Sequence, residues 1–78
     1  MAWVKLDDSM PTHPKVMAAG VDGYALDVAG ICYTNRLGLE GHIPSTGLRD
    51  VLPNLSHPAR AAAALVGAGL WEEVPDGW

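Results

Sequence analysis

The spacing of apolar positions changes along the chain, and each spacing predicts a different element. Residues 3–7 alternate apolar and polar side chains, which predicts a short strand or an extended arm. A short helix is expected over residues 13–19, with Thr12 as its cap and Gly20 as its stop. These segments together form an N-terminal arm and short helix over residues 1–20.

The longest helix is expected from Asp22 to Leu37, where Gly38 ends it. Apolar side chains surround most of this segment, and that distribution is typical of the buried central helix of a small domain. Gly30 is expected to permit a close helix crossing. Cys32 lies among apolar neighbours, so we expect an inert, buried thiol.

Two shorter helices follow a brief extended piece at residues 42–44. The first is expected over residues 46–52, and a Pro-Asn pair stops it. The second is expected over residues 57–68, with Ser56 or His57 as its cap. Its four consecutive alanines make it a strong helix former.

The last residues predict half of a β-hairpin. Gly69 ends the preceding helix in a Schellman motif, and a strand is expected to begin at Trp71. Asp76-Gly77 is a hairpin turn signal, and only Trp78 follows it. The second strand of this hairpin is therefore expected to be missing or to be supplied by another chain.

The order of elements from Ile43 to Trp78 is strand, helix, turn, helix and hairpin, which is the order of a winged helix-turn-helix. We expect a mostly α chain with a small β-wing, folded as a single winged-helix domain over residues 1–78. Residues 21–69 would form its helical core, and residues 70–78 a partial wing.

Six short segments, in an order that covers most of the chain, carry a family resemblance. They are Trp3-Val4-Lys5-Leu6-Asp7-Asp8, His13-Pro14-Lys15-Val16, Ala18-Ala19-Gly20, Ile31-Cys32-Tyr33-Thr34-Asn35-Arg36, Gly41-His42-Ile43-Pro44 and Ala68-Gly69-Leu70-Trp71-Glu72. In this succession the chain resembles the N-terminal winged-helix domains of replication-initiation-like proteins from phages of actinobacteria. The resemblance implies DNA binding at a replication origin or similar phage locus, in the bacterial host cytoplasm, with a replication protein as a possible partner. The chain departs from the family pattern at Asp27, where a large apolar residue is expected, and in its lack of a basic wing.

The expected DNA contacts gather at the start of the 57–68 helix, the end that enters the major groove in helix-turn-helix proteins. Arg60 is the expected base reader, and backbone N–H groups near Ser56 can hold a phosphate. The expected DNA-binding residues are Arg60, His57, Ser56, Asn54, Arg49 and Lys15. The alternative is an alanine-rich packing helix with one solvated arginine.

The charge of the chain limits this interpretation. The net charge is −4, with only five lysines and arginines, so one copy can neutralise few phosphates. A protein-interaction or dimerisation module on the same fold is therefore the alternative function. The expected interface is the strand edge at residues 70–78, through Trp71, Val74 and Trp78.

Other function classes find little support in the sequence. The three histidines have no metal-ligand spacing, and no nucleophile elbow surrounds a serine, so we expect no metal, no cofactor and no enzymatic activity. A single cysteine excludes an internal disulfide and fits a reducing cytoplasm. The chain has neither a continuous apolar run of about 18 residues nor a signal peptide, and we expect no membrane span.

Overall fold

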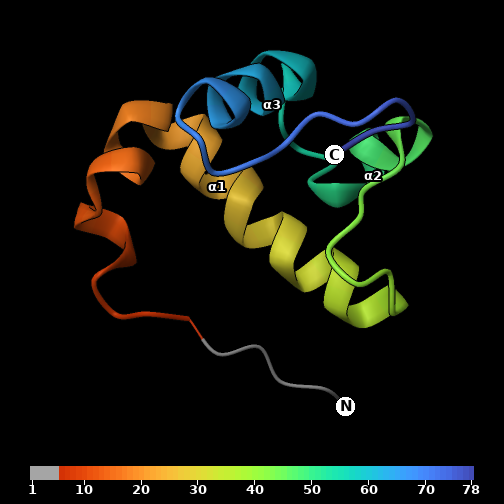
Figure 1. The fold of residues 1–78 in the computed structure, drawn as a ribbon, viewed down its shortest axis with the longest axis horizontal. Helices are drawn as coiled ribbons and strands as arrows, with labels where there is room; N and C mark the ends of the chain where they lie inside the picture. Colours follow the sequence, from red (N-terminus) through yellow and green to blue (C-terminus); the bar gives the residue numbers. More distant parts are fainter. Residues whose placement is uncertain (1–5) are drawn as a thin grey trace.

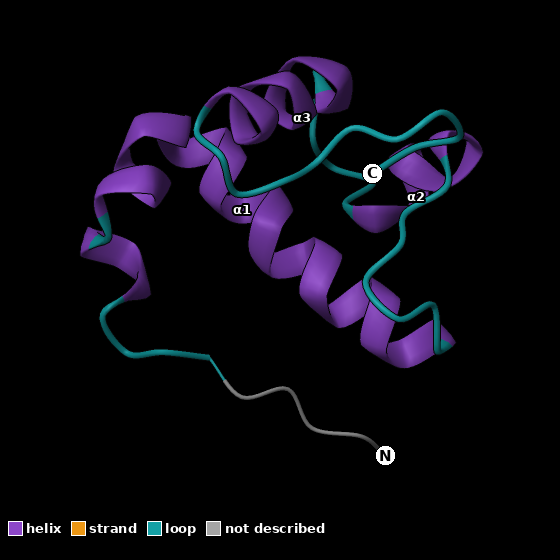
Figure 2. Cartoon of the chain, in the orientation of Figure 1, coloured by secondary structure: helices purple, strands orange, loops and turns teal. Residues whose placement is uncertain are grey.

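Two helices that pack against each other form the body of the molecule (Figure 1). The computed structural model describes residues 6–78, and the secondary structure in this part is helical, with no strand (Figure 2). The predicted, mostly helical class is confirmed. The elements, in chain order, are the 3₁₀ turn η1 (Met10–Thr12), α1 (Pro14–Leu37), the 3₁₀ turn η2 (Ser45–Gly47), α2 (Leu48–Val51) and α3 (Pro58–Gly67).

Helix α1 contains a break where two separate helices were predicted. Gly20 has φ 81° and ψ 178°, a conformation outside the helical region that glycine adopts without a Cβ clash. The N-cap is His13 and not Thr12, because the Nδ1 atom of His13 accepts a hydrogen bond of 3.2 Å from the Lys15 amide. The predicted C-terminal stop at Gly38 is confirmed, with φ 66° in the left-handed region. The expected arm at residues 3–7 falls largely outside the described residues.

The core lies where α3 crosses the middle of α1. Leu26 of α1 and Ala62 and Leu65 of α3 are fully buried. A Cβ at Gly23 would lie 3.8 Å from Leu65 of α3, an ordinary contact distance, but only 2.7 Å from the Cβ of Ala19. Gly23 therefore relieves crowding within α1, next to the break at Gly20. The prediction that Gly30 permits a close helix crossing was wrong. A Cβ at Gly30 would meet the Trp71 indole and Ile43, so this glycine allows the close approach of these two side chains and not of another helix.

The last two helices lie where the sequence predicts them, but their lengths differ from the predicted lengths. The helix predicted over residues 46–52 is η2 followed by the single turn of α2. Helix α3 ends in the predicted Schellman motif, in which the amides of Gly69 and Leu70 donate to the carbonyls of Val66 and Leu65, both at 3.0 Å. This motif turns the chain back toward α1.

The C-terminal segment corrects the prediction of an unpaired strand. It forms a turn, in which Gly77 donates to Val74 at 3.1 Å, and its returning arm pairs with residues 43–45 of the same chain. Ile43 and Trp78 exchange two backbone hydrogen bonds of 2.8 and 2.9 Å, and Ser45 donates to Asp76 at 2.8 Å. Two isolated bridges, Pro44 to Gly77 and Val74 to Gly77, stand where a β-wing was expected. We call this arrangement, residues 43–45 with 74–78, the C-terminal clasp.

One further expectation for α1 needs correction. Cys32 is exposed and not buried. By length and composition alone α1 can cross a membrane, a test that the buried central helix of a soluble protein also passes. The break at Gly20 leaves residues 21–37 as the continuous part, which is about 25 Å long, against about 30 Å for a hydrocarbon core. In the structure α1 is the central helix of a compact globule of 28 × 27 × 23 Å.

Candidate functional site

Four of the six residues expected to contact DNA line one hollow between α2 and α3. We call it the α2–α3 hollow; its volume is about 460 Å³. Arg49 comes from α2, Ser56 and His57 from the connecting turn, and Arg60 from the first turn of α3. All four residues are solvent-exposed. The structure therefore brings two arginines, a hydroxyl and an imidazole to one accessible surface.

A short connection explains why these side chains meet. Leu48 and Val51 are buried and fix α2 on the core, so Arg49 and Asp50 between them point outward. The chain then turns at Pro53, with the Leu55 amide donating to the Leu52 carbonyl at 3.0 Å. Helix α3 begins beside α2 within a few residues of this turn, which places its first turn next to Arg49.

The N-terminus of α3 lacks the side-chain cap that the sequence predicted. Neither Ser56 nor His57 makes a capping hydrogen bond, and the first helical bond is from the Ala61 amide to the His57 carbonyl at 3.1 Å. The N–H groups of Ala59 and Arg60 precede that bond and point out of the helix end. Together with the helix dipole they make this end of the hollow electropositive.

Two carboxylates oppose this positive charge. Asp50 lines an adjoining hollow of about 300 Å³, whose lining also includes Arg49 and Ser56. Asp22 of α1 lines a further hollow together with Arg60. The surface around the start of α3 thus combines two arginines with two aspartates, on a chain of net charge −4.

The structure does not bring Lys15 and Asn54 into the α2–α3 hollow. Asn54 is exposed in the turn that precedes it. Lys15 lies at the other end of α3, where its Nζ would be 3.7 Å from a Cβ placed on Gly69. Since α3 is about 15 Å long, Lys15 is too far from Arg60 to act with it on one phosphate. A lysine beside a helix C-terminus instead interacts favourably with the helix dipole and stabilises the helix.

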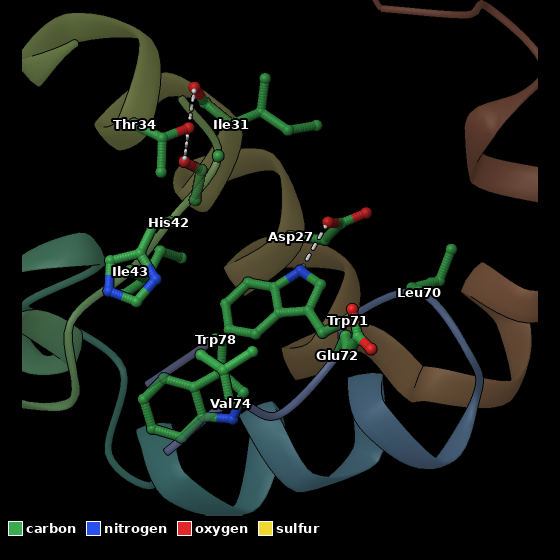
Figure 3. A pocket seen from close by; sticks show the side chains of 12 residues that line it. Asp27, Ile31, Thr34, His42, Ile43, Leu70, Trp71, Glu72, Val74 and Trp78 are labelled. Atoms are coloured by element: carbon green, nitrogen blue, oxygen red, sulfur yellow. Dashed lines mark hydrogen bonds between the residues drawn. The ribbon is translucent and has the colours of Figure 1, made fainter. Parts of the chain in front are cut away.

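A second hollow lies where the C-terminal segment crosses α1 (Figure 3). We call it the Trp71 hollow; its volume is about 370 Å³. The rings of Trp71 and Trp78 lie side by side, with centroids 6.2 Å apart and planes tilted by 50°. Asp27, Glu72 and His42 supply its polar groups. It shares no lining residue with the α2–α3 hollow.

Asp27 has a role that the sequence analysis missed. Its Oδ1 accepts a hydrogen bond of 2.9 Å from the indole Nε1–H of Trp71, as Figure 3 shows. A half-buried tryptophan needs an acceptor for this N–H. The available signal was an acidic residue in an otherwise apolar stretch of helix, in a chain with few tryptophans. That signal indicates a polar partner but does not identify one 44 residues away.

The expected dimer interface is occupied within the chain. Trp71, Val74 and Trp78 are all partly buried, and the two tryptophans pack against the core. The C-terminal clasp uses the backbone groups of Val74 and Trp78. The premise of an open strand edge in this segment is therefore wrong.

No comparison with known proteins adds to this picture. The chain matches no protein-family model, no curated protein and no solved structure. Within residues 6–78, no three histidine, cysteine, aspartate or glutamate side chains are grouped so that they could hold a metal ion. Function has to be argued from the two hollows.

Proposed function

We propose that this protein is a non-enzymatic DNA-binding module of the winged-helix type, which contacts duplex DNA through the start of α3. The observation that carries the proposal is the convergence of Arg49, Ser56, His57 and Arg60 on one exposed hollow at an uncapped helix N-terminus. Guanidinium groups, a hydroxyl and free amides are the groups that proteins use on phosphates and base edges.

The chain connectivity supports the winged-helix part of the proposal. Helix α1 is followed by an extended piece at residues 42–44, then by α2, a turn and α3. The turn at residues 74–77 then returns the chain to Pro44. A winged helix has this order, with its wing reduced here to single bridges.

Each side chain has a role in this proposal. Arg60 lies in the first turn of α3, the part of a recognition helix that contacts base edges, so it is the base reader. Arg49 and Ser56 position the DNA backbone, the first by charge and the second by its hydroxyl. His57 and Asn54 lie beside this contact, and Lys15 at the far end of α3 takes no part in it.

The biological setting follows from the family resemblance. The succession of short segments is similar to that of replication-initiation-like phage proteins, and on this resemblance we propose an activity at a phage replication or regulatory locus in the host cytoplasm. One module with few basic groups binds DNA weakly. A second domain, a second copy or a replication partner protein would raise the effective affinity by binding at the same time.

The experiment is fluorescence anisotropy of the full chain with a labelled duplex, for wild type and Arg60→Ala. If Arg60 contacts a base, the variant loses about 1–3 kcal/mol of binding free energy. Arg36→Ala is the matched control, because Arg36 stacks over Tyr33 near the end of α1, with its guanidinium carbon 5.8 Å from the ring centroid, and does not line the hollow. Equal affinity of both variants would remove Arg60 from the site.

A second candidate, a protein-interaction module without DNA binding, is favoured by one specific observation. Met17 and Val21 are 66% and 84% exposed beside the break at Gly20, and they line an apolar hollow with Tyr24. Large exposed apolar side chains that are grouped together mark protein-binding surfaces. Absence of any DNA binding in the same anisotropy experiment would favour this candidate.

A further inference from the structure

The Trp71 hollow combines aromatic walls with negative charge. Two partly buried indoles form part of its wall, and the carboxylates of Asp27 and Glu72 lie on its lining. No lysine or arginine of residues 6–78 lines it. The face of an indole ring is itself electronegative, so the aromatic and the acidic groups attract the same kind of ligand.

The carboxylate of Asp27 is held in a fixed orientation. Its Oδ1 accepts the Trp71 indole N–H, and within residues 6–78 its Oδ2 makes no hydrogen bond. Trp71 is partly buried and packs closely on Gly30, where a Cβ would lie 3.0 Å from the ring, so this side of the indole has no room to shift. The hollow therefore presents a pre-oriented acceptor beside an aromatic surface.

The surrounding charge is also negative. Glu73 and Asp76 are exposed in the same C-terminal segment as Glu72. His42 also lines the hollow, and its Nε2 lies 3.5 Å from Oδ2 of Asp76 in the C-terminal clasp. A cation entering the hollow would meet two carboxylates on its lining and a third and fourth nearby.

We propose that the Trp71 hollow binds an arginine side chain from a basic segment of a partner protein. A guanidinium is planar, stacks on indole faces and donates two parallel hydrogen bonds to a carboxylate, which a compact ammonium cannot do. A volume of about 370 Å³ lies at the lower end of the range of small-ligand sites and suits one side chain.

This inference does not depend on the proposed DNA binding. The Trp71 hollow and the α2–α3 hollow have no lining residue in common. The acidic hollow would repel phosphate, so the two surfaces select ligands of opposite charge. Loss of one activity in a variant leaves a readout for the other.

The test is an NMR titration of the ¹⁵N-labelled full chain with the peptide acetyl-Gly-Arg-Gly-Arg-Gly-amide. The indole N–H resonance of Trp71 reports directly on the hollow, because this group is hydrogen-bonded to Asp27. We expect saturable shifts of the Trp71 and Trp78 indole signals at peptide concentrations up to about 10 mM, which covers millimolar dissociation constants. The same peptide with citrulline in place of arginine keeps the shape and removes the charge, and should give no saturable shift.

Glu72→Gln and Glu73→Gln form a matched pair, since each removes one charge and only Glu72 lines the hollow. Glu72→Gln should weaken peptide binding about 5–10-fold, as expected for loss of a charge-assisted contact, and Glu73→Gln by less than about 2-fold, as expected for a screened neighbouring charge. Asp27→Asn keeps an oxygen acceptor for the indole and should weaken binding as much as Glu72→Gln.

Three results would overturn the proposal. The first is equal binding of the arginine and citrulline peptides, and the second is equal affinity of the Glu72→Gln and Glu73→Gln variants. The third is a dimer in light scattering that Glu72→Gln dissociates, because the occupant would then be a second copy of this chain and not a partner protein.

Discussion

The α2–α3 hollow and the Trp71 hollow lie on one small chain and differ in almost every physical property. The first is lined by Arg49, Arg60, Ser56 and His57, all exposed and joined by a short turn. The second is lined by partly buried indoles and by carboxylates, and is closed by backbone pairing between residues far apart in sequence.

This difference is relevant to the proposed DNA contact, because the chain as a whole has a net charge of −4. The acidic surplus is unevenly distributed: Asp27, Glu72, Glu73 and Asp76 belong to the Trp71 hollow or its rim. Net charge governs long-range attraction, whereas contact depends on the charges at the contacting surface. We therefore propose that the two hollows bind ligands of opposite charge.

The largest expected effect comes from the residue that supports both surfaces. Leu65 is fully buried between α3 and α1, and its carbonyl accepts the amides of Leu70 and Trp71. Leu65→Ala should lower the free energy of unfolding by about 2–5 kcal/mol, because it leaves a cavity in the core. Urea denaturation followed by circular dichroism measures the loss. A loss below about 1 kcal/mol would contradict the placement of Leu65 at the helix crossing.

A smaller effect should separate the two surfaces. Gly77 has φ 150°, and a Cβ there would collide with the Ile43 carbonyl and lie 2.8 Å from the Ser45 nitrogen. Gly77→Ala should open the C-terminal clasp, at a cost of about 1–3 kcal/mol, and leave α3 in place. Ser45 belongs to the clasp and also lines the α2–α3 hollow, so that edge of the hollow should shift with the clasp. Hydrogen exchange should show faster exchange at the Ile43 and Trp78 amides and unchanged exchange in α3.

The control for this variant is Gly67→Ala near the end of α3. A Cβ at Gly67 meets nothing within 4 Å, so this variant should be stable and is a direct comparison for Gly77→Ala. Alanine at this helical position should add up to about 1 kcal/mol of stability. Similar destabilisation by both substitutions would indicate that the clasp has no special role.

The hydrogen bond between Asp27 and Trp71 should contribute less than the clasp. Asp27→Ala removes the acceptor of the indole N–H, and we expect a loss of about 1–2 kcal/mol, since this charge-assisted bond is only partly buried. Asp27→Asn should recover most of that loss. Denaturation of both variants, with the Trp71 indole resonance as a local probe, measures the difference, and identical losses would argue against a hydrogen bond at this position.

The smallest expected effect concerns the contact between His42 and Asp76 at the rim of the clasp. Their side chains are 38% and 79% exposed, and His42 Nε2 lies 3.5 Å from Asp76 Oδ2. Solvent screens such a pair, so Asp76→Asn should change the free energy of unfolding by less than about 0.5 kcal/mol. A larger loss of unfolding free energy, measured by thermal denaturation at low salt, would mean that this pair contributes substantially to the stability of the clasp.

The two surfaces also differ in how far the sequence predicts them. Arg49, Ser56, His57 and Arg60 lie within a dozen residues, so helix caps and turn signals sufficed to place them near one another. The Trp71 hollow depends on contacts between Asp27, residues 42–43 and the C-terminal segment. Neither periodicity nor turn chemistry predicts such distant pairings, because their geometry follows from how the helices pack.

Three residues in or next to α1 show where this limit lies. Gly20 and Gly38 were recognised as stops because their backbone conformations are local properties. Cys32 was expected to be buried, yet it is exposed. A helix with apolar residues on nearly every side gives no indication of which side its partners will cover, and only the position of α3 and the C-terminal segment decides this.

We propose that the arginines of the α2–α3 hollow, and not the chain as a whole, contact DNA. The most direct test is fluorescence anisotropy with a labelled duplex across a salt series, for wild type, Arg49→Ala/Arg60→Ala and Arg36→Ala. The account predicts a log–log salt slope of about −2 to −4 for wild type and Arg36→Ala, and a slope closer to zero by about 2 in the double variant. Equal slopes in all three proteins, or no binding by wild type at about 50 mM salt, would contradict it.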